Sequence, residues 1–99
     1  MARPKKMDTE ALPESLAVPL AHFLNAMGND KGLAANTLDA YRRDLNRYLR
    51  HLVQLGIARI DAVEQQHVAK LMHALRESGL SPSTMARNLT SIKRFHQYL

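Results

Sequence analysis

Apolar side chains recur at alternating intervals of three and four residues along residues 36–56, and this spacing constrains the fold more than any other feature. It places those side chains on one face of an α-helix, which turns once in about 3.6 residues. The apolar face consists of Leu38, Tyr41, Leu45, Tyr48, Leu52 and Leu55. No segment of the sequence has the strict alternation of polar and apolar residues that predicts a half-buried strand, so we expect an all-α fold.

The same helical period occurs in three further segments, residues 16–27, 64–78 and 82–99. Pro19 falls in the first of these, and we expect it in the first helical turn, where its missing N–H removes no hydrogen bond. Gly28 and the "NDKG" segment after it are expected to end that helix, because glycine commonly follows the last helical residue. Four helices are therefore predicted.

Polar residues, glycine and proline mark the ends of the other helices. Asn36 is the expected N-cap of helix 36–56, and Gly56 is the expected glycine after its last turn. Gly79 is expected to stop helix 64–78. Ser81 is the expected N-cap of the last helix, with Pro82 at its first position, where the fixed φ of proline suits a helix. These signals place helix ends independently of the apolar period.

The chain has 99 residues, of which 45% are hydrophobic, and this predicts one small globular domain. We expect residues 1–13 to be a flexible polar tail and residues 14–99 to be the folded domain. The sequence has no cysteine and no apolar run long enough to cross a bilayer, so a reducing, cytoplasmic setting is expected. Because the apolar face of the last helix still runs at Leu99, we expect a further domain after that residue.

The net charge of +5 is concentrated in two of the predicted helices. Residues 36–56 contain four arginines against two aspartates, and residues 81–99 contain three lysines and arginines and no acid. Residues 1–35 and 57–80 are each neutral. A charge confined to two helices indicates a polyanionic partner.

On both of these helices the basic residues lie opposite the apolar face. The basic face of helix 36–56 holds Asn36, Arg43, Arg47 and Arg50. The basic face of the last helix holds Ser83, Thr84, Arg87, Thr90, Ser91 and Arg94. Arginine forms bidentate bonds with guanine or phosphate, and hydroxyls donate to phosphate, so these faces favour duplex DNA. The solvated face of an ordinary amphipathic helix is the alternative interpretation.

Two stretches carry a family resemblance, "NTLDAYRRDL" at residues 36–45 and "SPSTMARNLTSIKRFHQYL" at residues 81–99. The first resembles the T-x-x-x-Y-x-x-x-L opening of the second helix in the N-terminal core-binding domain of tyrosine recombinases, which include phage integrases and Xer-type resolvases. The second is similar to the fourth helix of that domain, with its Ser/Thr, Arg, Leu and aromatic residues in order. With the spacer between them, the resemblance spans residues 16–99.

The resemblance implies a SAM-like bundle of four helices in two crossed hairpins, which forms one jaw of a clamp around a recombination half-site. The second and fourth helices of such a domain face the major groove of double-stranded DNA. The resemblance also implies that a catalytic domain of the same chain follows residue 99 and that the recombinase assembles as a tetramer on DNA. This chain would then be a non-catalytic, nucleoid-associated part of the enzyme.

The DNA contacts that the resemblance implies are Thr37, Arg43, Ser83, Thr84, Arg87 and Ser91. Helical geometry adds Arg47 and Arg94, because these two residues continue the same faces of their helices. The predicted interface therefore consists of eight residues on two helices.

The sequence contains no motif for catalysis, metal binding or cofactor binding. Tyr41 and Tyr48 lie on the apolar face of their helix and are expected to be packing residues, as is Tyr98. No two histidines have the i, i+4 spacing of a zinc helix, and no glycine-rich phosphate loop occurs. We expect no catalytic residue, no metal and no cofactor.

Two other functions also fit the sequence. Residues 64–99 match a helix-turn-helix whose second helix reads DNA, as in a transcriptional regulator, and the arginines of helix 36–56 would then have no role. In a protein-interaction module, the basic residues would instead meet an acidic partner protein. The arginines of helix 36–56 therefore discriminate between the first alternative and the clamp.

Overall fold

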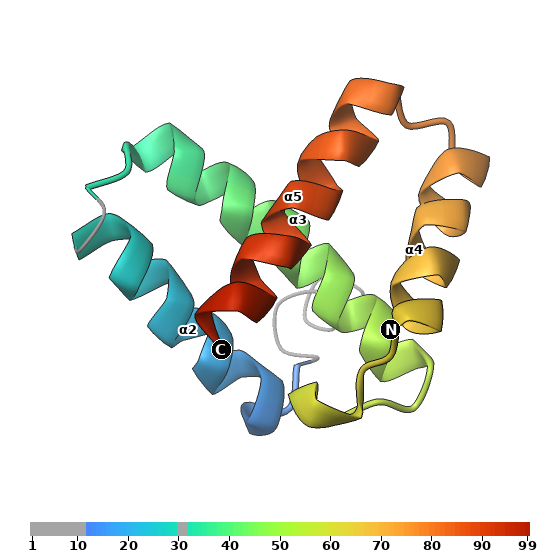
Figure 1. Cartoon of the computed structure of the whole chain (residues 1–99), viewed down its shortest axis with the longest axis horizontal. Coiled ribbons are helices and arrows are strands. Elements are labelled where there is room, and N and C mark those ends of the chain that lie inside the picture. Colours follow the sequence, from blue (N-terminus) through green and yellow to red (C-terminus); the bar gives the residue numbers. More distant parts are fainter. Residues whose placement is uncertain (1–11, 30–31) are drawn as a thin grey trace, which may run out of the picture.

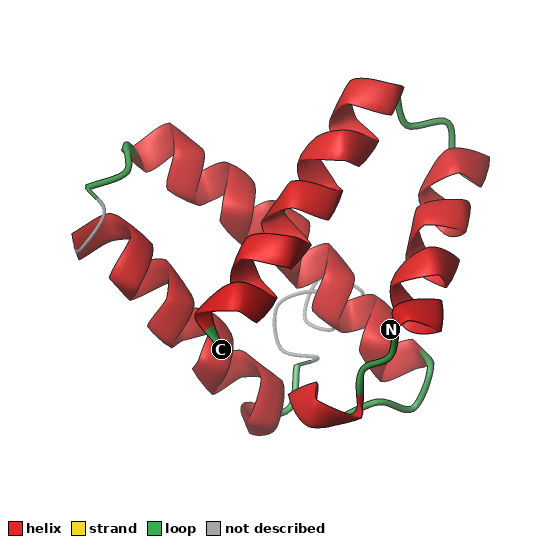
Figure 2. Cartoon of the chain, viewed as in Figure 1, coloured by secondary structure: helices red, strands yellow, loops and turns green. Residues whose placement is uncertain are grey.

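The computed structural model describes residues 12–29 and 32–99, and every regular element within those ranges is a helix (Figures 1 and 2). The elements are α2 (Glu14–Asn29), α3 (Ala35–Gln54), the short 3-10 helix η1 (Ile60–Ala62), α4 (Gln65–Glu77) and α5 (Pro82–Tyr98). The predicted all-α class is confirmed. Most of the expected N-terminal tail, residues 1–11, lies outside the described residues, as do residues 30–31.

The four α-helices of residues 12–29 and 32–99 form two hairpins that cross. α2 and α3 make one hairpin, α4 and α5 make the other, and α5 passes over α3 (Figure 1). As a result, α3 and α5 each contact the other three helices. This is the predicted four-helix arrangement, and it packs the two basic helices against each other.

Aromatic rings from α2, α3 and α5 pack together around the buried ring of Phe23. The ring centroid of Phe23 on α2 lies 5.5 Å from that of Phe95 and 5.6 Å from that of Tyr98, both on α5. The Tyr41 ring on α3 lies 5.9 Å from Phe23. Leu99, which was expected on the inner face of the last helix, is instead 52% exposed.

Three helix ends agree with the prediction from the sequence. The Oγ of Ser81 accepts the N–H of Thr84 at 3.2 Å, and Pro82 occupies the first helical position of α5. Gly56 and Gly79 follow α3 and α4 with φ angles of 83° and 89°, in the left-handed region that glycine favours. Local sequence signals therefore define these boundaries.

The predicted N-cap of α3 is wrong. The helix begins at Ala35, with Ala34 in the capping position and no capping side chain, and the N–H of Leu38 bonds to the Ala34 carbonyl at 3.0 Å. Asn36 therefore lies inside the first turn, exposed on the helix surface.

Pro19 does not lie in the first turn of its helix, contrary to the prediction. α2 begins at Glu14, and the carbonyl of Pro13 accepts the N–H of Leu16 at 2.9 Å at the start of the helix. Pro19 consequently offers no N–H to the carbonyl of Ser15. The burial of one apolar face of α2 stabilises the helix despite this missing bond.

Gly28 is the second-last residue of α2, which ends at Asn29 within the predicted segment. A Cβ atom at this position would lie 3.1 Å from Cδ1 of Leu38, on α3. The close approach of the two helices of this hairpin therefore accounts for the glycine, and the left-handed residue follows later, at Gly32.

Candidate nucleic-acid interface

An open groove lies between the N-terminal half of α3 and the face of α5, and its volume is about 370 Å³. It is lined by Asn36, Thr37, Ala40, Tyr41, Arg87, Thr90 and Arg94. Three residues that the sequence predicted as contacts, Thr37, Arg87 and Arg94, are thus brought together from two helices. The lining offers hydroxyl, amide and guanidinium donors and contains no acid, as a phosphate-binding surface requires.

Arg87 is held in place from α3 by the carboxylate of Asp44. Its Nε donates to Oδ2 at 2.9 Å and its Nη2 donates to Oδ1 at 2.7 Å. These hydrogen bonds raise the pKa of the Arg87 guanidinium. The Arg87 side chain is 46% exposed, whereas that of Asp44 is 1% exposed, so the charged group that faces solvent is the arginine.

Asp44 is the residue at this site that the sequence reasoning missed. It lies three residues after Tyr41 and four residues before Tyr48, so the helical period places it on the buried face of α3. A carboxylate at a core position is rarely buried unless it is paired. That spacing was the available signal for a partner on a neighbouring helix.

Ser91 does not lie on the exposed face of α5, contrary to the prediction. It is fully buried, and its Oγ donates to Oδ2 of Asp44 at 2.9 Å. α5 packs against three helices, so its buried arc is wider than its apolar stripe. Ser91 therefore does not line the groove. Its only link to the groove is its hydrogen bond to Asp44, which in turn binds Arg87.

The other arginines of the predicted interface differ in exposure and in hydrogen bonding. Arg43 on α3 and Arg94 on α5 are exposed, and within the described ranges neither has an ion pair or a hydrogen bond. Arg47 is half-buried, and its Nη1 makes a long contact of 3.5 Å with Oδ1 of Asn88 on α5. Arg43 and Arg94 are therefore exposed charges that no partner in the described ranges neutralises.

Ser83 and Thr84 lie in the first turn of α5, about 16 Å along the helix from Arg94. Ser83 is exposed and Thr84 is half-buried. Both hydroxyls lie near the capping Oγ of Ser81, at 3.2 Å and 3.0 Å. Ser83 and Thr84 lie on the same basic helix as Arg87 and Arg94, but they do not line the groove.

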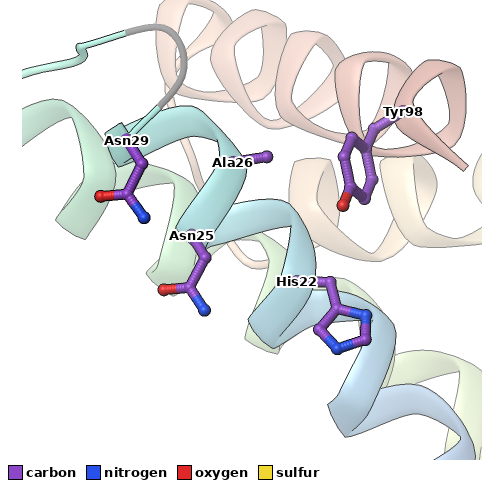
Figure 3. Close-up of a pocket in the computed structure, with 5 residues that line it drawn as sticks. All are labelled: His22, Asn25, Ala26, Asn29 and Tyr98. Atoms are coloured by element: carbon purple, nitrogen blue, oxygen red, sulfur yellow. The ribbon is translucent and has the colours of Figure 1, made fainter.

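A second open pocket, of about 320 Å³, lies between α2 and the last turn of α5 (Figure 3). Figure 3 shows Tyr98 of α5 facing α2, which contributes His22, Asn25, Ala26 and Asn29. No residue of the predicted interface lines it. Tyr98 packs by its ring against Phe23, as expected for a packing residue.

The part of the chain that the structure describes lacks a metal-binding cluster and a membrane-spanning helix. It contains no group of three or more His, Cys, Asp or Glu side chains that could hold a metal ion. None of its helices is both long and apolar enough to span a bilayer.

The family model described as "Phage integrase, N-terminal SAM-like domain" matches residues 20–99. The match includes α3, α4, α5 and most of α2, together with all eight predicted contact residues. The chain belongs to this family. The crossed hairpins are therefore those of a phage integrase SAM-like domain, and the groove lies on that domain between its second and fourth helices.

Curated relatives of this SAM-like domain carry the name Tyrosine recombinase XerD. The chain is 34% identical to the protein of Staphylococcus haemolyticus (strain JCSC1435), 35% to that of Staphylococcus epidermidis (strain ATCC 12228) and 33% to that of Staphylococcus aureus (strain N315), each over 79 residues. Each alignment covers 80% of this chain and 27% of the relative, so the chain spans about a quarter of the length of the relatives it matches. No solved structure matches the chain significantly.

Proposed function

We propose that this chain is the DNA-binding core-binding domain of a site-specific tyrosine recombinase, and that it grips a recombination half-site through α3 and α5. The observation that carries the proposal is the acid-free groove in which Thr37, Arg87 and Arg94 meet at the crossing of the two basic helices. Membership of the integrase family and the names of the relatives support the recombinase part of the proposal.

In this proposal the residues of the interface have different tasks. Arg43 and Arg94, which are exposed, neutralise phosphates and release counterions. Ser83 and Thr84 donate to a phosphate at the N-terminus of α5, where the helix dipole favours an anion. Arg87 reaches a base edge in the major groove.

The chain itself cuts no DNA in this proposal. A catalytic domain elsewhere in the same longer protein carries out strand cleavage, and a recombinase tetramer assembles on the DNA. The SAM-like domain acts as the half of the clamp that fixes the position and register of the duplex.

The salt dependence of DNA binding tests the phosphate contacts. Arg94→Gln and Arg43→Gln should each weaken binding to a fluorescent duplex and reduce the slope of log K against log salt by about 0.9, because each removes one phosphate neutralisation. Arg76→Gln is the matched control, because Arg76 is an exposed arginine on α4 and its loss changes the net charge equally. Equal slopes for Arg94→Gln and Arg76→Gln would contradict the proposal.

An NMR titration of backbone amides with a short duplex separates the clamp from the two other functions. Shifts on both α3 and α5 that fade at high salt support the clamp. Shifts confined to α4, the turn and α5 favour a helix-turn-helix regulator, because that mode leaves the arginines of α3 idle. An absence of shifts at low salt would favour a protein-interaction module.

A further inference from the structure

The carboxylate of Asp44 lies in an unusual place for a protein with a basic surface. It is buried at the crossing of the two basic helices and points at the residues that line the groove. A negative charge near a DNA-binding surface repels phosphates, and a buried ion pair is weak evidence for stability. The placement of Asp44 therefore calls for a role other than folding or general attraction to DNA.

Three hydrogen bonds fix the orientation of the Asp44 carboxylate. Two come from Arg87 and the third comes from Ser91, one turn further along α5. Because Ser91 is fully buried, its hydroxyl cannot be replaced by water at this position without a rearrangement. The carboxylate therefore holds the Arg87 guanidinium in a fixed position, and we call this pairing the seat of Arg87.

The seat uses only one side of the guanidinium. Arginine carries five N–H donors in a planar fork, and Asp44 receives the Nε donor and one Nη2 donor. The two Nη1 donors and the second Nη2 donor remain on the outer edge, and the half-exposed side chain lines the groove. This outer edge has the geometry to donate two parallel hydrogen bonds to O6 and N7 of a guanine.

We propose that Asp44 is a positioning residue for sequence readout: it holds Arg87 so that the outer edge of the guanidinium meets a guanine in the major groove. The inference rests on the proposed DNA-binding function and assigns a division of labour within it. Arg87 is pre-ordered and supplies specificity, because little side-chain entropy is lost when it binds a base. Arg43 and Arg94 have no such seat in the described residues and supply affinity that does not depend on sequence.

The test begins with the 99-residue chain and a duplex library randomised over about one helical turn, about 10 base pairs. Selection gives an enriched duplex, and a scrambled duplex of the same composition serves as the non-specific probe. The quantity measured is the specificity ratio, which is the Kd for the scrambled duplex divided by the Kd for the enriched duplex. Parent protein that binds neither duplex at low salt overturns the proposed function and the inference with it.

Asp44→Asn separates positioning from charge, because the two effects have opposite signs. An amide offers one acceptor oxygen to a fork with two donors, so we expect the specificity ratio to fall by about tenfold. Binding to the scrambled duplex should stay equal or tighten, because a negative charge is removed. The matched control is Asp39→Asn, an exposed acid on the same helix paired with Arg42, which should leave the ratio unchanged. If Asp44→Asn behaves as Asp39→Asn does, the inference is wrong while DNA binding stands.

Ser91→Ala is the second variant if Asp44→Asn does not fold. It removes one of the three bonds to the carboxylate and changes no charge, so the specificity ratio should fall while the salt slope is retained. A pair of arginine variants tests base readout directly. Arg87→Lys should lower the specificity ratio because lysine lacks the planar fork of donors, whereas Arg94→Lys should leave the ratio unchanged. An unchanged ratio in Ser91→Ala overturns the role of Asp44, and an unchanged ratio in Arg87→Lys overturns base readout.

Discussion

At the scale of single residues, burial sets the protonation of a tyrosine–histidine pair between α3 and α5. The hydroxyl of Tyr48 lies 2.7 Å from Nε2 of His96, and Tyr48 is fully buried. Burial raises the pKa of Tyr48 and lowers the pKa of His96. The pair is therefore a hydrogen bond between a neutral phenol and a neutral imidazole.

This pair predicts that the domain loses stability in mild acid. Because the pKa of His96 is lower in the folded state, the unfolded chain binds more protons below its own pKa of about 6.5. The contribution of His96 is complete above that pH and declines as the pH falls toward the folded pKa, by at most about 1.4 kcal/mol per pH unit. His96→Gln should flatten the fall in unfolding free energy measured by urea titration between about pH 7 and about pH 5.

The control for this prediction is His22→Gln, because His22 is exposed on α2. Some slope should remain in His96→Gln, since burial also lowers the pKa of His51. If both variants keep the slope of the parent, the pair does not govern the acid response.

At the scale of elements, two serines at the start of α5 have different roles. Ser81 caps the helix, and Ser83 is proposed to contact DNA. Ser81→Ala removes the cap of the Thr84 N–H and should cost about 1 kcal/mol of unfolding free energy. Ser83→Ala should leave stability nearly unchanged, because alanine is favoured inside a helix. Thermal unfolding measured by circular dichroism checks both values.

The two serines are matched, since both are exposed and lie two residues apart. DNA binding should respond in the opposite order: Ser83→Ala should weaken binding to the duplex more than Ser81→Ala does once both proteins are folded. A Ser83→Ala protein that binds as tightly as the parent would remove Ser83 from the proposed interface.

At the scale of the whole molecule, the aromatic cluster joins the hairpins into one cooperative unit. Phe23 is fully buried and contacts rings from α3 and α5. Phe23→Ala should cost about 3–5 kcal/mol. Small domains have about 5–15 kcal/mol of unfolding free energy in total, so this is a large fraction of the stability. The unfolding midpoint in urea should fall steeply, with all four helices unfolding together.

Val18→Ala is the control in the same helix. Val18 is 43% exposed, and its truncation should change the unfolding free energy by less than about 0.5 kcal/mol. Independent unfolding of α2 in Phe23→Ala, with the other helices intact by amide exchange, would contradict a single cooperative unit.

The sequence by itself determined the four helices of the described residues, several of their ends and the location of the charge. These features are local: the apolar period identifies the helices, and Ser81, Pro82, Gly56 and Gly79 act through their own backbone and nearest neighbours. The family resemblance added the two crossed hairpins, which the structure has. The same reasoning placed Arg87 correctly on an exposed face.

The tertiary structure alone decided which polar residues are buried and which arginine is held in place. A helical period predicts one buried face, but α3 and α5 each pack against three helices, and the wider buried arc includes Asp44, Asn88 and Ser91. The reason for a glycine at position 28 is also tertiary, because a larger residue there would crowd Leu38 of another helix. Contacts between segments distant in sequence depend on the angle and register at which helices cross, which no single amphipathic pattern contains.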